Sequence, residues 1–160
     1  MKIIEIEPNS LAAAAGIKPG DDIRKINGHV IRDAIDYRFY SSDEFLEIEF
    51  YRFGIPHTVQ IEKEFDEAPG IIFKDIRYKC CGNKCIFCFI DQNPPGMRPA
   101  LYLKDEDYRL SFIYGNYVTL TSISRRALQR IVEQRLSPLY ISVHSTDPEI
   151  RKQMLGIKKD

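Results

Sequence analysis

The four cysteines of this chain all lie in one short segment. Cys80 is followed directly by the run Cys81-Gly82-Asn83-Lys84-Cys85-Ile86-Phe87-Cys88, which has the spacing C-x3-C-x2-C. No cysteine occurs elsewhere, so disulfides cannot tie distant segments of the chain together. Thiolates that converge on one point are typical of a soft metal centre. We therefore expect the chain to fold so that it holds this loop as a metal site.

The number of cysteines favours an iron–sulfur cluster over other soft metal centres. A structural zinc takes four ligands, commonly as two separated pairs, and only Cys85 and Cys88 form such a pair. Cys80 and Cys81 are adjacent, so their side chains diverge and supply one ligand more easily than two. Three cysteines from one loop satisfy three irons of a 4Fe–4S cube and leave the fourth iron open to a second molecule. Zinc, and a cysteine cluster without metal, remain as alternatives.

Length and composition indicate a folded protein of one medium or two small domains. The chain has 160 residues, of which 44% are hydrophobic. No apolar run approaches the roughly 20 residues of a membrane span, and the first residues alternate isoleucine with acidic side chains, unlike a signal peptide. With clustered thiols and no export signal, we expect a cytoplasmic protein. Residues 1–68 carry excess acidic charge and residues 69–160 excess basic charge, but no basic tract is dense enough to indicate nucleic-acid binding.

Residues 1–68 are predicted to form a small β-rich domain. Period-2 alternation predicts strands at 2–7, 22–26, 45–51 and 57–62, with a Gly54-Ile55-Pro56 turn between the last two. Ser10 is expected to cap a short alanine-rich helix that ends before Gly16. Asn27-Gly28 is a hairpin signal.

Residues 69–160 are predicted to alternate strands with helices, which is typical of a parallel sheet with crossover helices. We expect strands at 71–73, 108–114, 117–121 and 139–143, a helix capped by Ser122 or Ser124 that runs through Arg135, and a helix that starts at Thr146 or Asp147 and stops at Gly156. The arginines of the first helix are expected to face solvent, and Val132 is expected to face the core.

Lys104-Asp105-Glu106-Asp107 is expected to be a solvated turn, and Cys80 a small buried residue. Ser142 and His144 lie at the carboxyl end of the strand expected at 139–143, the side on which βα proteins bind ligands, so they are candidate cofactor contacts, although a structural role for His144 is an alternative.

The first unit resembles a bacterial PDZ domain. The resemblance rests on turn residues that match in order, from Pro8-Asn9-Ser10 through Ala15-Gly16-Ile17-Lys18-Pro19-Gly20-Asp21-Asp22-Ile23 to Ile26-Asn27-Gly28. It implies peptide binding by addition of a strand to a sheet edge. The chain begins after the point where a PDZ domain carries its carboxylate-binding loop, so docking within the same polypeptide is the alternative.

The cysteine loop resembles the signature of radical S-adenosylmethionine (radical SAM) enzymes. The resemblance implies that Cys81, Cys85 and Cys88 bind a 4Fe–4S cluster, whose open iron chelates S-adenosylmethionine for reductive cleavage to a 5′-deoxyadenosyl radical. It implies that Phe87 packs near the adenine. Gly115-Asn116 is a candidate for the turn that receives the amino group of S-adenosylmethionine, although the usual two glycines and acidic residue are absent and a plain turn is the alternative.

Together the two units resemble a narrower bacterial family, that of PDZ plus radical SAM proteins with a C-terminal DUF 512-type domain. Its members continue through a longer partial TIM-type barrel, so we expect this α/β chain to hold only the first βα units of the barrel and to be an incomplete enzyme. The resemblance implies an external electron donor and a substrate that the sequence does not identify. A zinc-binding module without catalysis and a PDZ-type peptide-binding protein are the alternative functions.

Overall fold

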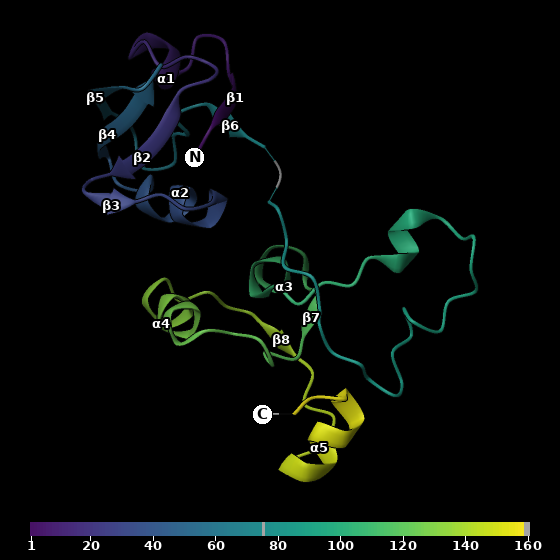
Figure 1. The fold of residues 1–160 in the computed structure, drawn as a ribbon. Coiled ribbons are helices and arrows are strands. Elements are labelled where there is room, and N and C mark those ends of the chain that lie inside the picture. The colour runs from purple at the N-terminus through teal and green to yellow at the C-terminus, as the bar shows by residue number, and fades with distance from the viewer. Residues whose placement is uncertain (75, 159–160) are drawn as a thin grey trace. The chain divides into compact units, whose positions relative to one another are not determined.

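The chain folds into two compact units, Met1–Ile76 and Arg77–Asp160. The structure is a computed structural model that describes residues 1–74 and 76–158 (Figure 1). The last residue of the domain expected at 69–160 lies outside the described residues. None of the described helices is both long and apolar enough to cross a membrane.

The first unit is rich in antiparallel strands, as predicted. Its strands are β1 (Ile3–Ile6), β2 (Asp22–Ile26), β3 (His29–Val30), β4 (Phe45–Arg52), β5 (Ile55–Glu62) and β6 (Ile71–Phe73), and its helices are α1 (Leu11–Ala14) and α2 (Ala34–Tyr40). Four strands form one antiparallel sheet in the order β3-β2-β4-β5, and β1 pairs with β6.

Local signals set the turns and helix starts of this unit. Asn27 and Gly28 both adopt positive φ, 49° and 78°, as a two-residue hairpin between β2 and β3 requires. The Ser10 hydroxyl accepts a hydrogen bond from the Ala13 amide and caps α1, as predicted. The turn between β4 and β5 is Phe53-Gly54, not Gly54-Ile55-Pro56, because Ile55 already pairs with Arg52.

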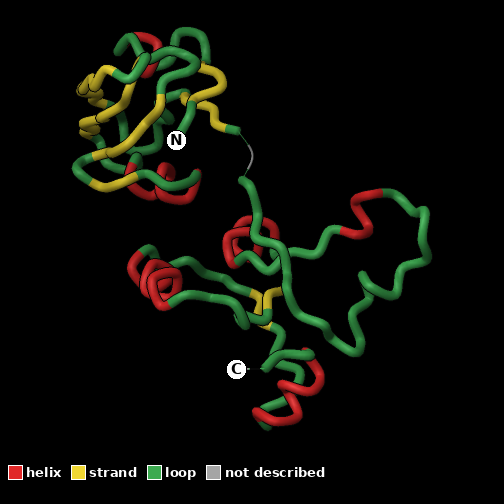
Figure 2. The backbone as a smooth tube through the Cα atoms, in the orientation of Figure 1, coloured by secondary structure: helices red, strands yellow, loops and turns green. Residues whose placement is uncertain are grey.

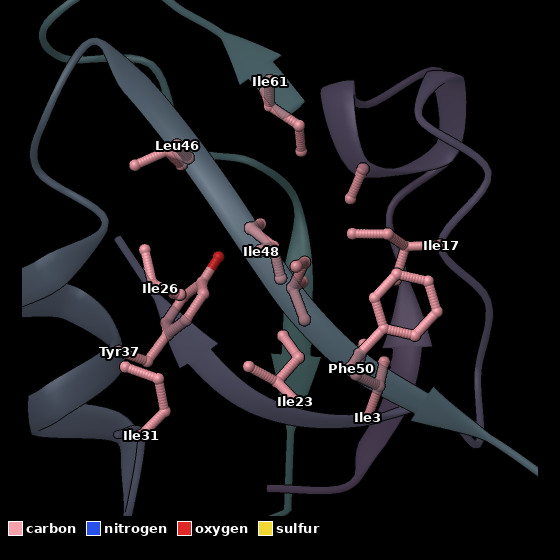
Figure 3. Close-up of a cluster of buried hydrophobic side chains, with 12 residues drawn as sticks. Ile3, Ile17, Ile23, Ile26, Ile31, Tyr37, Leu46, Ile48, Phe50 and Ile61 are labelled. Atoms are coloured by element: carbon pink, nitrogen blue, oxygen red, sulfur yellow. The ribbon is translucent and has the colours of Figure 1, made fainter. Parts of the chain in front are cut away.

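The core of the first unit is built from buried apolar side chains, many of them isoleucines, on neighbouring strands. Ile23 and Ile26 of β2 face Leu46, Ile48 and Phe50 of β4, and all are almost fully buried (Figure 3). Full burial of one such side chain contributes about 1.5–3 kcal/mol, so this face accounts for much of the stability of the unit.

Strand β6 belongs to the first unit, although the sequence placed residues 71–73 after the domain boundary at residue 68. It pairs antiparallel with β1, with Ile3 opposite Phe73 and Ile6 opposite Ile71. The approach is close at Gly70, where an added Cβ would lie 2.3 Å from the Cβ of Ser10. The boundary between the compact units therefore falls after Ile76.

The second unit contains a parallel strand pair joined by a crossover helix. Its elements are η1 (Pro99–Tyr102), α3 (Tyr108–Tyr114), β7 (Tyr117–Val118), α4 (Arg125–Glu133), β8 (Tyr140–Ile141) and α5 (Pro148–Leu155). Strands β7 and β8 pair in parallel with α4 between them, so the predicted βα pattern is confirmed. Figure 2 shows that the segment before η1, which holds the cysteines, is loop.

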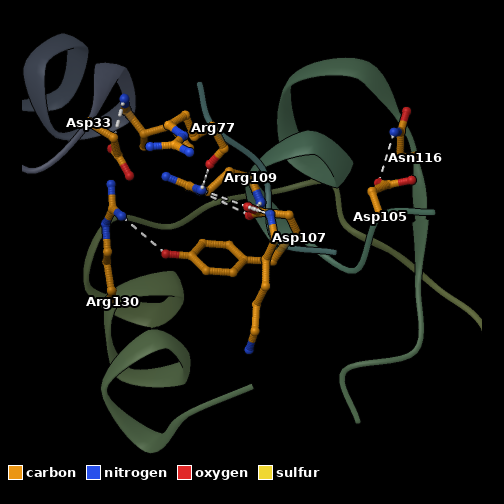
Figure 4. A network of polar contacts seen from close by, with 10 residues as sticks. Asp33, Arg77, Asp105, Asp107, Arg109, Asn116 and Arg130 are labelled. Carbon is orange, nitrogen blue, oxygen red and sulfur yellow. Dashed lines mark hydrogen bonds and ion pairs between the residues drawn. The ribbon is translucent and has the colours of Figure 1, made fainter. Parts of the chain in front are cut away.

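Two predictions about secondary structure and burial in this unit are wrong. Residues 108–114 form helix α3 and not a strand, because Asp107 caps the helix and Gly115 ends it in the left-handed conformation. In α4, Val132 is 76% exposed whereas Arg130 is 6% exposed. The buried Arg130 guanidinium is hydrogen-bonded: its Nε donates to Gln134 Oε1 and its Nη1 donates to the Tyr108 hydroxyl (Figure 4), which offsets part of the cost of burying it.

Candidate metal centre

The cysteine loop starts from a short antiparallel contact inside the second unit. Cys80 pairs with Asp105, and the Cys81 amide donates to the Lys104 carbonyl at 2.8 Å. The Glu106 amide donates in return to the Lys79 carbonyl at 2.8 Å. The first thiol of the motif is therefore fixed by backbone pairing.

The far side of the loop rests against the end of α5. The Lys84 amide donates to the Leu155 carbonyl at 3.1 Å and the Ile86 amide donates to the Met154 carbonyl at 3.0 Å. Gly156 ends α5 with a φ of 61°, and a Cβ there would lie 2.3 Å from the Lys84 carbonyl oxygen. A glycine stop thus allows the helix end and the loop to approach closely.

All four cysteines are free thiols. Cys88 is buried, whereas Cys81 and Cys85 are partly exposed. Burial raises the pKa of Cys81 and of Cys85. The charge of Glu106, and less that of Cys88, raises the pKa of Cys81 further, and the charges of Cys81 and Cys88 raise that of Cys85. The expectation that Cys80 is buried is wrong: it is exposed, at the outer edge of the loop.

The thiols fit a soft metal by their chemistry but are not arranged around one. Among residues 1–74 and 76–158, no group of three His, Cys, Asp or Glu side chains has an arrangement that holds a metal ion. Cys81, Cys85 and Cys88 lie within eight residues of one loop. Their role as metal ligands stays a prediction.

A lysine beside the thiols was not predicted from the sequence. Lys104 Nζ donates to Asp91 Oδ2 at 2.5 Å and to the Asn83 carbonyl at 3.1 Å. The Asp91 carboxylate raises the pKa of Lys104, and the charges of Cys88 and Cys81 add to this effect. Lys104 therefore places a positive charge where bound thiolates would concentrate negative charge.

The expected solvated turn at 104–107 is wrong because two of its carboxylates are buried. Asp107 accepts hydrogen bonds from the Lys79 amide at 3.0 Å and from Arg109 Nη2 at 2.6 Å, and Arg109 also donates to the Arg77 carbonyl (Figure 4). Burial would raise the pKa of Asp107, but the bonds from Arg109 and Lys79 outweigh it and lower the pKa. Glu106 is buried against Thr119, with a distance of 2.8 Å between Thr119 Oγ1 and Glu106 Oε1.

Two of the predicted cofactor contacts lie side by side. The rings of Phe87 and His144 have centroids 4.8 Å apart and planes 34° apart. His144 has a φ of 65°, which turns the chain after β8. Ser142 extends the pairing of β7 and β8, because its amide donates to the Val118 carbonyl at 2.8 Å. Phe87, which directly precedes Cys88, thus contacts His144 in the loop after β8.

Gly115 and Asn116 lie at the opposite, amino end of β7. Gly115 ends α3 with a φ of 77°, and Asn116 Nδ2 donates to Asp105 Oδ2 at 3.1 Å (Figure 4). Both residues have a structural role in this turn. A contact with S-adenosylmethionine stays a prediction for Gly115, Asn116 and Ser142.

The two units define a chain that joins an antiparallel domain to a βα domain with a three-cysteine loop. Comparison with protein families finds two domains in the same order along the chain, although the second match begins before the boundary between the compact units. The model of the Radical SAM-like domain matches residues 63–160, and the model of the PDZ domain matches residues 2–50. The chain therefore belongs to the Radical SAM-like family and carries a PDZ domain at its N-terminus. No curated protein matches it. The DUF 512-type extension stays a prediction.

Proposed function

We propose that the chain is part of a radical SAM enzyme in which Cys81, Cys85 and Cys88 hold a 4Fe–4S cluster. The observation that supports this most strongly is that the cysteine-bearing loop contacts the segments directly after β7 and β8, through Asn83 with Thr119 and Phe87 with His144, in a chain of this family. Parallel sheets bind their ligands at that edge. When bound, the cluster would supply the electron that cleaves the sulfonium bond of S-adenosylmethionine.

The residues around the loop would bind and orient this cofactor. Lys104 would offset the charge of the bound thiolates through its ammonium group. Phe87, which is 37% exposed, and His144 together offer an aromatic surface of the kind on which adenine stacks. The proposed enzyme also needs a substrate and an external electron donor.

Anaerobic reconstitution tests the proposal. With iron, sulfide and a reductant, the chain should take up about four irons and show the broad absorbance of a 4Fe–4S cluster. S-adenosylmethionine and dithionite should then yield 5′-deoxyadenosine. Cys85→Ala should abolish iron uptake and product, whereas Cys80→Ala should leave both unchanged because Cys80 lies outside the motif. About one zinc and no iron in the wild-type chain would contradict the proposal and favour the zinc module.

Peptide binding by the PDZ domain is a second proposal, supported by a cavity in the first unit. The cavity has a volume of about 360 Å³ and is lined by residues of α2, by the segment between β5 and β6 and by the start of β6. Its wall includes the basic residues Arg38 and Lys63 and the acidic residues Glu7, Asp66 and Glu67. Among the described strands β6 pairs only with β1, so its other edge can accept an extended peptide.

A screen of peptides with free or amidated chain ends tests this second proposal. A peptide carboxylate would be attracted by Arg38, so Arg38→Ala should weaken binding of the free-ended peptides. Arg24→Ala is the matched control, because Arg24 contacts Tyr51 and Asp22 and does not line the cavity. Equal weakening by both variants, or no binding by the wild-type chain, would contradict a carboxylate site in this cavity.

A further inference from the structure

Asn83 is a buried polar residue in the middle of an exposed loop. It lies between the predicted ligands Cys81 and Cys85 and is 6% exposed, whereas its neighbours Gly82 and Lys84 are exposed. A buried amide is stable only when its donors and acceptor are bonded. The side chain therefore needs partners outside the loop.

Those partners come from the segment directly after β7. Asn83 Nδ2 donates to Thr119 Oγ1 at 3.1 Å, and Asn83 Oδ1 accepts from Thr121 Oγ1 at 3.0 Å. Lys104 Nζ donates to the carbonyl of the same asparagine at 3.1 Å. Asn83 is thus held through both its side chain and its backbone.

The carboxylate of Glu106 determines which atoms donate and which accept in this hydrogen-bond network. Glu106 accepts from the Thr119 amide at 3.0 Å and from Thr119 Oγ1 at 2.8 Å. Since a hydroxyl has a single hydrogen and Thr119 gives it to Glu106, the Thr119 oxygen can only accept from Asn83. The network therefore requires an amide and not a carboxylate at position 83.

The network is also anchored from α5 and is fully bonded. Arg151 Nη2 donates to the Thr119 carbonyl at 2.8 Å. Within the described part of the chain, no buried side-chain nitrogen or oxygen lacks a hydrogen-bond partner. A buried network that is fully satisfied restricts the geometry of the segments it joins.

We propose that Asn83 is a positioning residue that ties the midpoint of the C-x3-C segment to Thr119, Thr121 and Glu106 and so fixes the backbone from which Cys81 and Cys85 would reach the cluster. The inference rests on the proposed function, because it assigns Asn83 a role in holding the cluster of that enzyme. Residues that orient metal ligands from outside typically change metal affinity 10–100-fold when they are replaced.

Three variants test the inference in the full chain, with release of iron to a chelator as the readout after anaerobic reconstitution. Asn83→Asp keeps the shape of the side chain but removes the donor to Thr119. Thr119→Val keeps the shape but removes the hydroxyl, and Thr119→Ser restores it. We expect Asn83→Asp and Thr119→Val to release iron about 10-fold faster or more, and Thr119→Ser to release it at the wild-type rate.

A control separates positioning from general loss of stability. Asn27→Ala removes hydrogen bonds to Asp43, the Phe45 carbonyl and the Glu47 amide in the first unit. It should lower the melting temperature without changing iron release or the electron paramagnetic resonance spectrum of the reduced cluster. The Thr119→Val spectrum should differ from the wild-type spectrum.

The outcomes distinguish the inference from the proposed function. Wild-type iron release by both Asn83→Asp and Thr119→Val would overturn the inference and leave the proposed function intact. A loss shared by Thr119→Ser would also overturn it, since the hydroxyl would not be the group that matters. Failure of the wild-type chain to take up iron would overturn both.

Discussion

Replacement of Gly156 by alanine should detach the cysteine loop from the end of α5. Gly156 has a φ of 61°, a conformation that disfavours an alanine by about 1–2 kcal/mol. The added Cβ would lie 2.3 Å from the Lys84 carbonyl oxygen and 2.9 Å from its carbonyl carbon. Because ordinary contacts require about 3.5 Å, the loop backbone must retreat by roughly 1 Å.

This movement affects two hydrogen bonds, from the amides of Lys84 and Ile86 to α5. Each contributes about 0.5–1.5 kcal/mol net. Together with the backbone strain, Gly156→Ala should destabilise the docked loop by roughly 2–5 kcal/mol. Since about 1.4 kcal/mol corresponds to tenfold in an equilibrium, amide hydrogen exchange at Lys84 and Ile86 should accelerate by more than about tenfold.

Gly96→Ala is the matched control. Gly96 also has a positive φ, of 83°, but nothing lies within 4 Å of its added Cβ. It should therefore incur backbone strain alone and leave exchange at Lys84 and Ile86 unchanged. Nuclear magnetic resonance resolves exchange at single amides. Equal exchange at these amides in both variants would show that close packing against Gly156 does not hold the loop.

Three further predictions concern titration and capping. Burial would raise the pKa of Asp21, but Arg52 and the Lys18 amide outweigh it and lower the pKa; the stabilisation is therefore present above about pH 4 and is lost as pH falls through the lowered pKa, and Asp21→Asn should reduce this acid sensitivity in urea unfolding. Burial, with a smaller effect of Glu7, raises the pKa of Tyr37 far above its usual range, so stability should fall as pH rises above about 10, and Tyr37→Phe should remove that decline in thermal melts. Asp107→Ala removes the cap of α3 and the ion pair with Arg109 and should lower the free energy of unfolding by about 3 kcal/mol, whereas Asp107→Asn should lose less because it still caps; equal losses would contradict a role for the cap.

Local sequence signals predicted most of the first unit because its strands alternate and its turns use residues with special backbone preferences. Asn27-Gly28 and Ser10 act as expected because each effect depends on neighbours within a few residues. In the second unit, Ser124 and Asp147 cap their helices for the same reason. The two strands β7 and β8 were also placed correctly, although they are shorter than predicted.

Helix α3 was mispredicted because its aromatic and β-branched residues resemble a strand. Its boundaries were nevertheless marked in the sequence, since Asp107 precedes it and Gly115 follows it, and these are ordinary start and stop signals for a helix. The caps determine that this segment is a helix, because Asp107 accepts hydrogen bonds from both the amide and the guanidinium of Arg109 in the first turn.

At the site, the cysteine motif was visible in the sequence but its supports were not. Asn83, Glu106 and Thr119 meet only in three dimensions, and no spacing rule connects an asparagine in a loop to threonines after a strand. Glu106 is buried because it packs against Thr119 in this cluster. Phe87 and His144 were proposed as contacts of one cofactor, and the structure brings their rings together.

The seating of the cysteine loop on α5 has a consequence for synthesis of the protein. The thiols leave the ribosome well before Met154, Leu155 and Gly156 are made, at roughly 5–20 residues per second. For a period on the order of seconds, the nascent chain therefore carries its cysteines without the helix end that holds them. The hydrogen bonds from Lys84 and Ile86 to α5 can therefore form only after α5 has been translated.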